Sequence, residues 1–320
     1  MIRIGLLGAG TMGAMHASVY AGMPDVEVVG VFARTLDRAR RVAGICRSIP
    51  VGDARALIGR ADVDAIDVCL PSALHPEFVV SALVHGKHVF CETPMALEMD
   101  RAQEMRAAAR RAKRLLQVGL LMRSVGAYAH VKAATMSGEH GRLINLSAWR
   151  LGSYLHPDAP GRKAHYSDPA IELMTFDFDV LLWLMGRPTR LTAMGDGDVT
   201  ALLDYADGRH ATVKASGLMP PGSPFTVGFR ALFERAVFML QTTFVGTVPD
   251  STFTVATAGT PPTEVPMADR NPYEAELRRF VDCIGGNADP AFLDADRAIE
   301  ALDLSLATQR ALADGQPVTL

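Results

Sequence analysis

The chain has 320 residues, of which 49% are hydrophobic and 21% charged, a length and composition that suit two domains with separate cores. Its formal net charge of −3 carries no footprint for nucleic acid, so we expect no nucleic-acid partner. We see no signal-peptide pattern and no apolar run of membrane length, and therefore expect a cytoplasmic protein with no membrane partner. The four cysteines have neither metal-like nor disulfide-like spacing, so we expect no metal site.

The first third of the chain alternates apolar strands with helical patterns. The strands read as continuous apolar runs, which is typical of parallel strands buried on both faces. We expect strands at Ile2–Leu7, Val26–Phe32, Ala65–Leu70, His88–Cys91 and Leu115–Val118. We expect helices between them at Thr11–Ala21, Leu36–Cys46, Pro76–His85 and Met99–Lys113. Short links between alternating strands and helices predict an α/β fold with a doubly wound parallel sheet, the Rossmann arrangement.

The pattern changes after about residue 120. A helix at Gly126–Ser137 and a strand at Leu143–Leu151 are followed by a loop rich in Pro, Gly and His, and then by a helix from about Ile171 to Met185. Alternating β-rich runs separated by turn signals predict an open, mainly antiparallel sheet. We expect its strands at Thr189–Met194, Val199–Tyr205, His210–Ser216, Thr226–Phe233, Ala236–Gln241 and Thr252–Thr257. Two helices, Pro272–Ile284 and Ala295–Ala313, close the chain.

The first strand leads directly into a glycine-rich turn that opens a helix. Gly8, Gly10 and Gly13 fit the G-x-G-x-x-G pattern of dinucleotide-binding loops, and this strand–turn–helix context makes the pattern specific. The first glycine permits the tight turn, the second lets the backbone approach a pyrophosphate, and the third lets helix and strand pack closely. We therefore expect Gly8, Gly10, Thr11, Met12 and Gly13 to bind a nicotinamide dinucleotide at the helix N-terminus.

The residues after the second strand bear on which dinucleotide is bound. An acid there would bind the ribose hydroxyls of NAD, but this chain has Arg34 and Thr35, with Arg38 one helical turn further on. A guanidinium and a hydroxyl suit a 2′-phosphate. The sequence thus favours NADP, while NAD stays possible if Arg34 only stacks on the adenine.

The order of motifs resembles the glucose–fructose oxidoreductase / inositol dehydrogenase / MocA family over essentially the whole chain. The glycine loop is followed by His16, and later segments of the resemblance are Asp64–Ser72 with His75, Gly86–Leu97, Ser137–Gly141 and the helix around Trp183. The resemblance implies a Rossmann domain over residues 1–120 and a substrate-binding and oligomerisation domain over residues 121–320. Its open sheet would form a homodimer or homotetramer.

The family's usual activity is hydride transfer between NAD(P) and a carbon of a sugar or polyol. The resemblance places Leu70, Pro71, Ser72 and His75 in the loop along the cofactor. It places Glu92 near the nicotinamide ribose, and we assign the neighbouring Thr93 to the cofactor site as well.

The chain departs from the family pattern where the chemistry occurs. Family members commonly have Glu-Lys-Pro where this chain has Glu92-Thr93-Pro94, and a threonine cannot replace an ammonium directly. The family's Asp and His pair corresponds to Glu172 and Phe176 here, and a phenyl ring cannot relay a proton. The run Gly119–Met122 is also apolar where relatives have polar residues. These changes indicate a less polar substrate, different chemistry or lost catalysis.

Other groups remain that can move a proton. Glu172 keeps a carboxylate at this position. In a hydrophobic pocket its pKa would rise, which suits an acid or base. Alternatively, it only caps or solvates the start of its helix. Tyr166 or His165 would protonate an alkoxide with Lys163 nearby, unless this segment is an ordinary polar loop. We expect Phe176 and Arg123 to contact the substrate. Arg123 would bind a carboxylate or phosphate group of the substrate, unless Arg123 forms an ion pair on the protein surface instead.

Three functions are compatible with these residues. The first is an NAD(P)-dependent oxidoreductase with atypical acid–base residues, acting on a carbonyl, alcohol or imine carbon of a small molecule. The second is a cofactor-binding regulator or sensor that no longer transfers hydride. The third is a lyase or hydrolase that uses NAD transiently. We favour the first because the cofactor loop is intact.

Overall fold

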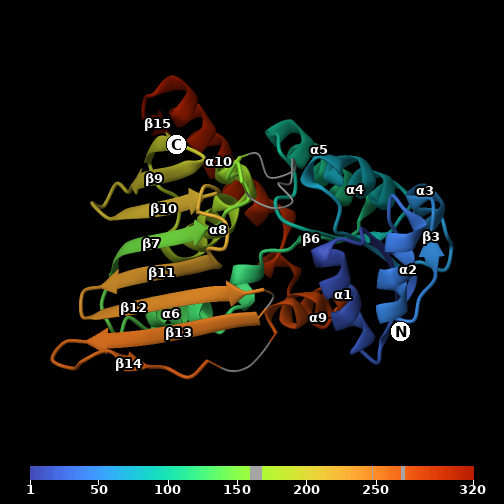
Figure 1. Cartoon of the computed structure of the whole chain (residues 1–320), viewed down its shortest axis with the longest axis horizontal. Helices are drawn as coiled ribbons and strands as arrows, with labels where there is room; N and C mark the ends of the chain where they lie inside the picture. The colour runs from blue at the N-terminus through green and yellow to red at the C-terminus, as the bar shows by residue number, and fades with distance from the viewer. Residues whose placement is uncertain (159–167, 247, 268–270) are drawn as a thin grey trace. The chain divides into compact units, whose positions relative to one another are not determined.

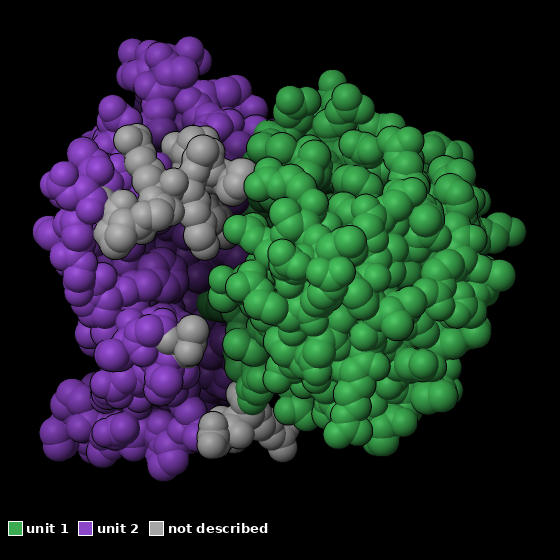
Figure 2. Space-filling view, turned by 45° about the vertical axis from the view of Figure 1, so that its right-hand side comes forward, with its two compact units in different colours: residues 1–124, 270–299 green, residues 125–269, 300–320 purple. Residues whose placement is uncertain are grey.

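The computed structural model describes residues 1–158, 168–246, 248–267 and 271–320. The chain divides into two compact units, which Figure 2 shows in different colours. Unit 1 comprises residues 1–124 and 270–299, and unit 2 comprises residues 125–269 and 300–320. The N-terminal unit therefore includes a segment from near the C-terminus of the chain.

Unit 1 is a Rossmann domain, as predicted. Its six strands form one parallel sheet in the order β3-β2-β1-β4-β5-β6, with the chain reversing direction along the sheet after β3 (Figure 1). The strands are β1 (Ile2–Leu7), β2 (Val26–Phe32), β3 (Pro50–Val51), β4 (Ala65–Val68), β5 (His88–Cys91) and β6 (Leu116–Val118). The helices are α1 (Thr11–Ala21), α2 (Leu36–Ile45), α3 (Ala54–Ile58), α4 (His75–Val84), α5 (Met99–Ala112), α9 (Pro272–Ile284) and the 3₁₀ turns η1 (Ser72–Leu74), η2 (Leu121–Ser124) and η3 (Pro290–Phe292).

Two short elements of unit 1 were not predicted. Strand β3 has two residues and helix α3 has five, so neither is long enough to show a hydrophobic period. Helix α3 begins where the Asp53 carboxylate accepts a hydrogen bond from the backbone N–H of Arg55 at 2.9 Å. Local capping and pairing with β2 set these elements.

The core of unit 1 joins its two chain segments. Leu277, Phe280 and Val281 of α9 are buried in the same cluster as Leu6 of β1 and Phe90 of β5. Helix α9 packs on α1, the helix that follows the glycine loop. The far end of the chain thereby contributes to the packing around the cofactor loop.

Unit 2 contains the predicted open sheet. Nine strands lie in the order β14-β13-β12-β11-β7-β10-β9-β8-β15, and every pair is antiparallel except β7 with β10 (Figure 1). The strands are β7 (Leu143–Leu151), β8 (Arg190–Asp196), β9 (Asp198–Asp204), β10 (His210–Ser216), β11 (Phe225–Phe233), β12 (Ala236–Val245), β13 (Val248–Thr257), β14 (Thr263–Glu264) and β15 (Val318–Thr319). The two-residue edge strands β14 and β15 are too short to be predicted from periodicity.

The helices of unit 2 are α6 (Gly126–Ser137), α7 (Pro169–Glu172), α8 (Met174–Met185) and α10 (Ala295–Asp314), the last of which starts in unit 1. The prediction of one helix from about 171 to 185 was wrong. The chain forms two helices that meet at Leu173, whose φ of −117° departs from helical geometry. Helix α7 starts earlier than predicted because Asp168 caps it by accepting a hydrogen bond from Ala170 N–H at 2.8 Å. Helix α8 packs on β7 and β10.

Within the residues that the structure describes, no helix has both the length and the apolar character needed to cross a membrane.

Candidate functional site

The glycine loop connects β1 to α1 at the carboxyl edge of the parallel sheet. Gly8 has a φ of +120°, and a Cβ there would lie 2.3 Å from the carbonyl oxygen of Cys69. A Cβ at Gly13 would lie 2.1 Å from the carbonyl oxygen of Gly8. Both positions therefore require glycine for the loop and its neighbours to fit.

Gly10 has a different role from the other two glycines. Apart from Gly10 itself and its two neighbours along the chain, no heavy atom among the described residues lies within 4 Å of the position that a Cβ at Gly10 would take. Gly10 is also the N-cap of α1, and no side chain caps this helix in the described part of the chain. Open space beside uncapped backbone N–H groups fits the pyrophosphate of a dinucleotide.

The segment after β2 presents cationic side chains to solvent. Arg34, Thr35 and Arg38 are all exposed. Thr35 is the N-cap residue of α2, but its side chain makes no capping hydrogen bond. Arg34 and Arg38 have no hydrogen bond or ion pair with any described residue. These two guanidinium groups remain available to an external anion such as a phosphate.

His75 joins two loops of unit 1. It is 1% exposed at the start of α4, and its two ring nitrogens lie 2.9 Å from the carbonyl oxygen of Pro94 and 2.7 Å from that of Leu70. Burial lowers the pKa of His75, and the neutral ring donates only one of the two hydrogen bonds. His75 therefore positions the loop of Leu70, Pro71 and Ser72 against the segment that follows β5.

Glu92 and Thr93 follow β5 at the same edge of the sheet. The Thr93 hydroxyl donates a hydrogen bond to the carbonyl oxygen of Gly119 at 2.8 Å. The Thr93 N–H donates to Glu92 Oε2 at 3.2 Å. At the position where the family resemblance predicts a lysine, a hydroxyl thus fastens the backbone after β6.

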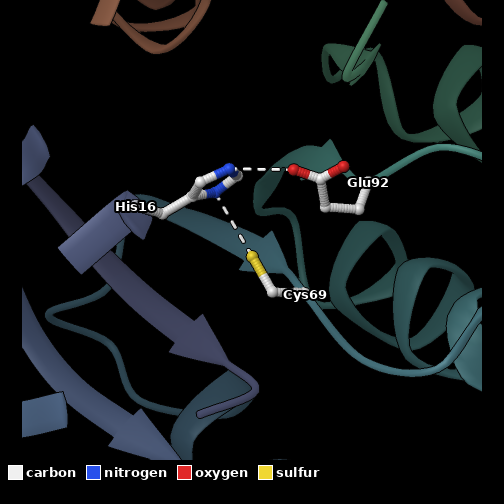
Figure 3. A group of neighbouring side chains, drawn as sticks. All are labelled: His16, Cys69 and Glu92. Atoms are coloured by element: carbon white, nitrogen blue, oxygen red, sulfur yellow. Dashed lines mark hydrogen bonds and ion pairs between the residues drawn. The ribbon is translucent and has the colours of Figure 1, made fainter. Parts of the chain in front are cut away.

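His16 on α1 is the centre of a buried polar cluster (Figure 3). Its Nδ1 lies 2.8 Å from Asp67 Oδ2 and 3.2 Å from Cys69 Sγ. Its Nε2 lies 2.8 Å from Glu92 Oε1, at ion-pair distance but without the alignment of a hydrogen bond. Glu276 of α9 is 1% exposed beside the cluster.

Burial and mutual charge alter the protonation of this cluster. Burial disfavours the charged ring of His16, but Cys69 and Asp67 outweigh it, and the pKa of His16 lies well above its ordinary value. Burial, reinforced by the charge of Glu92, raises the pKa of Glu276 well above its ordinary value. Burial and the nearby Asp67 likewise raise the pKa of the Cys69 thiol. Each of these three groups therefore holds its proton more tightly than the same group would in water.

Three ligand-type atoms, from His16, Cys69 and Glu92, lie within 4.8 Å of one another. Metal binding would require a free lone pair on His16. Asp67 and Glu92 flank the two ring nitrogens, and the raised pKa of the ring favours its doubly protonated form. We therefore interpret the group as a network of hydrogen bonds and charges.

The predicted catalytic half lies in unit 2. Glu172 is the last residue of α7 and is 6% exposed. Asp168, not Glu172, caps that helix. One turn further on, the half-buried ring of Phe176 lies against the Arg150 guanidinium. The Cζ atom of Arg150 is 4.7 Å from the centroid of the Phe176 ring. Lys163, His165 and Tyr166 lie outside the described residues.

Arg150 also forms a buried ion pair with Asp177. The side chains are 5% and 1% exposed, and two hydrogen bonds of 2.8 Å and 3.1 Å join them. Burial raises the pKa of Asp177, and the guanidinium opposes that rise. This pair joins the start of α8 to β7, and its guanidinium also contacts the ring of Phe176.

Arg123, predicted to contact the substrate, is 6% exposed in η2. Its guanidinium donates a hydrogen bond to the carbonyl oxygen of Phe292 at 2.9 Å and lies over that ring. This contact engages part of the Arg123 guanidinium within unit 1. That Arg123 contacts the substrate stays a prediction.

Sequence reasoning did not single out Asp67 or Glu276. Asp67 had a detectable signal, since it is a lone charge inside the apolar strand β4. Glu276 had none, because an acid on an amphipathic helix is ordinarily solvated. Its burial follows from the packing of α9 on α1.

The parallel sheet, the glycine loop and the open helix N-terminus together define a dinucleotide-binding oxidoreductase. The model of the oxidoreductase family with an NAD-binding Rossmann fold (GFO/IDH/MocA) matches residues 2–120, and the model of the GFO/IDH/MocA C-terminal domain matches residues 128–239. The chain belongs to this family, as the motif order predicted, and is an NAD(P)-dependent enzyme of hydride transfer.

Similar proteins span the whole chain. A 1,5-anhydro-D-fructose reductase of Ensifer adhaerens is 26% identical over 99% of this chain and 98% of its own length. A scyllo-inositol 2-dehydrogenase (NAD(+)) of Bacillus subtilis is 26% identical over 100% of this chain and 96% of its own length. The solved structure of a levoglucosan dehydrogenase in complex with NADH shares the fold, with a TM-score of 0.86 and 18% identity. The match covers 99% of this chain and 98% of the levoglucosan dehydrogenase chain.

Proposed function

We propose that this enzyme uses NADP to interconvert a carbonyl or imine carbon and its reduced form in a small substrate less polar than a free sugar. The observation that carries the proposal is the Phe176 ring, which lies on the Arg150 guanidinium where the family resemblance predicts a histidine. An aromatic surface favours apolar parts of a substrate and offers no proton. The substrate would therefore be sugar-derived but partly deoxygenated, or a cyclic ketone or imine.

The preference for NADP rests on Arg34, Thr35 and Arg38. When bound, the cofactor supplies the hydride. Gly8, Gly10, Thr11, Met12 and Gly13 would hold its pyrophosphate, and exposed Arg34 and Arg38 a 2′-phosphate. Two similar proteins carry NAD(+) or NADH in their names, so the two cofactors need direct comparison.

The cofactor preference is tested by titrating the protein with NADPH and NADH and following the nucleotide's fluorescence. Loss of a charge-assisted contact to phosphate costs about 1.5–3 kcal/mol, or roughly 10- to 150-fold in affinity. Arg34→Ala should weaken NADPH by that factor and leave NADH within about twofold. Arg47→Ala, an exposed arginine after α2, is the control. Equal loss for both nucleotides would contradict the assignment.

The acid–base group that we propose in unit 2 is Glu172, the only described member of the predicted set. Lys163, His165 and Tyr166 are proposed to assist it. Its 6% exposure suits a carboxyl group whose proton is used in a desolvated site.

The substrate class is tested by NADPH oxidation with 1,5-anhydro-D-fructose, keto-inositols, simple cyclic ketones and cyclic imines. We expect ketones or imines with few hydroxyls to have the highest kcat/KM. Glu172→Gln should lower kcat roughly 10²- to 10⁴-fold, while Glu264→Gln on β14 should not change it. Tight NADPH binding with no turnover across the panel would instead favour a cofactor-dependent sensor, to which the missing lysine points.

We also propose self-association through the open sheet. Cross-strand pairs of β12 and β13 line a groove of about 290 Å³ formed by Met239, Gln241, Thr243, Asp250, Thr252 and Thr254. Met239 is the hydrophobic residue of this groove, and it is 43% exposed. Met239→Glu should convert a dimer or tetramer to a smaller species in light scattering, and a monomeric wild type would contradict the proposal.

Four free cysteines support a cytoplasmic location.

A further inference from the structure

His16 lies between two carboxylates that belong to different elements of unit 1. Asp67 comes from β4 and faces Nδ1, while Glu92 follows β5 and faces Nε2, each at 2.8 Å. The side chains of His16 and Asp67 are fully buried, and that of Glu92 is 12% exposed. Glu92 is thus the only member of this row with access to solvent.

Burial favours the uncharged forms of the other titratable groups around the ring. It raises the pKa values of Cys69 and Glu276, as described above. Tyr20 and Tyr273 pack their rings against His16, and burial raises the pKa of Tyr20 well above its ordinary value. Phe90 closes a further side. The imidazole of His16 therefore lies between two carboxyl groups, and burial favours the uncharged forms of Cys69, Glu276 and Tyr20 around it.

We propose that His16 is a positioning residue that stores the proton of the reaction and exchanges it with substrate through the Glu92 carboxylate. This inference rests on the proposed function, because it needs a carbonyl or imine that takes up a proton when reduced. It gives this chain a source of protons in unit 1, where Thr93 stands at the position of the family lysine.

One hydride and one proton reach the substrate in each reduction. The substrate carbon gains the hydride, and its oxygen or nitrogen gains one proton, which the protonated Glu92 carboxyl supplies while Glu172 orients the reacting atom by a hydrogen bond. That carboxyl is formed when Nε2 of His16 gives its proton to Oε1. Asp67 stabilises the imidazolium beforehand, and the neutral ring regains a proton from solvent through Glu92 after product leaves. In the oxidative direction each transfer is reversed.

The contact between His16 and Glu92 has a geometry suited to gating. The two atoms are 2.8 Å apart but misaligned for a hydrogen bond, and Oε2 of Glu92 accepts from Thr93 N–H at 3.2 Å. The terminal torsion of a glutamate is soft. A small rotation of the carboxyl group therefore decides whether the proton passes.

The first test needs no substrate. Two-dimensional NMR of ¹⁵N-histidine-labelled protein with bound NADPH reports the protonation of each ring nitrogen. We expect His16 to be doubly protonated at pH 7.5 in the wild type. Asp67→Asn keeps a hydrogen-bond acceptor but removes a charge, so it should lower the midpoint of the His16 titration by at least about one pH unit. A neutral His16 at pH 6.5 in the wild type would refute the proposal.

The second test uses the panel substrate with the highest rate. In the wild type, kcat for reduction should fall as pH rises through the His16 titration, because the proton store is then empty. His16→Gln should lower kcat roughly 10- to 100-fold and remove this dependence on pH, with the NADPH affinity within about threefold. His85→Gln, at the exposed end of α4, should keep the wild-type profile.

Failure of the proton store can be distinguished from failure of the proposed function. A wild-type pH profile in His16→Gln, or one equivalent of zinc in the purified protein, would overturn the proton store. A doubly protonated His16 without turnover of any substrate would refute the oxidoreductase proposal and the transfer to substrate together. A neutral His16 with good turnover would refute the proton store alone.

Discussion

Glu276 provides a test of how unit 1 is packed. Its carboxyl group is 1% exposed, and neither oxygen has a hydrogen-bond partner within the described residues. Because its folded pKa is raised, the group contributes its full stability below the unfolded pKa, near 4.3, and that contribution is lost as pH rises toward the folded value. Glutamine has the same shape and does not titrate.

Substitution Glu276→Gln should therefore become more favourable as pH rises. Above the unfolded pKa, wild-type stability falls relative to the variant by about 1.4 kcal/mol per pH unit. Between pH 5 and pH 7 the free energy of unfolding of the variant should gain about 2.6 kcal/mol on that of the wild type, provided the folded carboxyl stays protonated throughout.

The assay is urea denaturation at pH 5, 6, 7 and 8, followed by fluorescence. Glu274→Gln provides a matched control, because Glu274 lies on the same helix and is exposed. Its stability difference from wild type should not vary with pH. If the difference for Glu276→Gln were equally constant, the carboxyl would be ionised in the folded protein, and its burial between α9 and α1 would be refuted.

Three further predictions concern single contacts. Gly13→Ala should lower the melting temperature because its Cβ would lie 2.1 Å from a carbonyl oxygen, whereas Gly10→Ala should keep that temperature and weaken NADPH binding. Asp177→Asn should cost about 3–5 kcal/mol in urea denaturation because it leaves Arg150 buried without its counter-charge; a cost below about 1 kcal/mol would contradict the buried pair. His75→Ala should cost about 1–3 kcal/mol and weaken NADPH binding, since one loop carbonyl loses its donor and the ring that joins the two loops is gone; unchanged NADPH affinity would argue against the positioning role.

Long periodic elements could be predicted from the sequence because their information is local. Strands β1, β2 and β5 and helices α1, α6 and α9 match the expected ranges residue for residue. The strands are apolar runs, α9 is amphipathic, and α1 follows a glycine loop that has positions where only glycine fits. Fold class, family and the location of the cofactor loop follow from such patterns.

The arrangement around His16 depended on the tertiary structure. Its partners Asp67 and Glu92 are 51 and 76 positions away along the chain, and Glu276 comes from a helix that the chain adds to unit 1 only after completing most of unit 2. Sequence patterns show that each of these residues is polar, but not which ones share a desolvated space. Charge and pKa depend on that shared space. The sequence therefore predicted a dinucleotide-binding loop, and only the folded chain brought the buried ring of His16 between the carboxyl groups of Asp67 and Glu92.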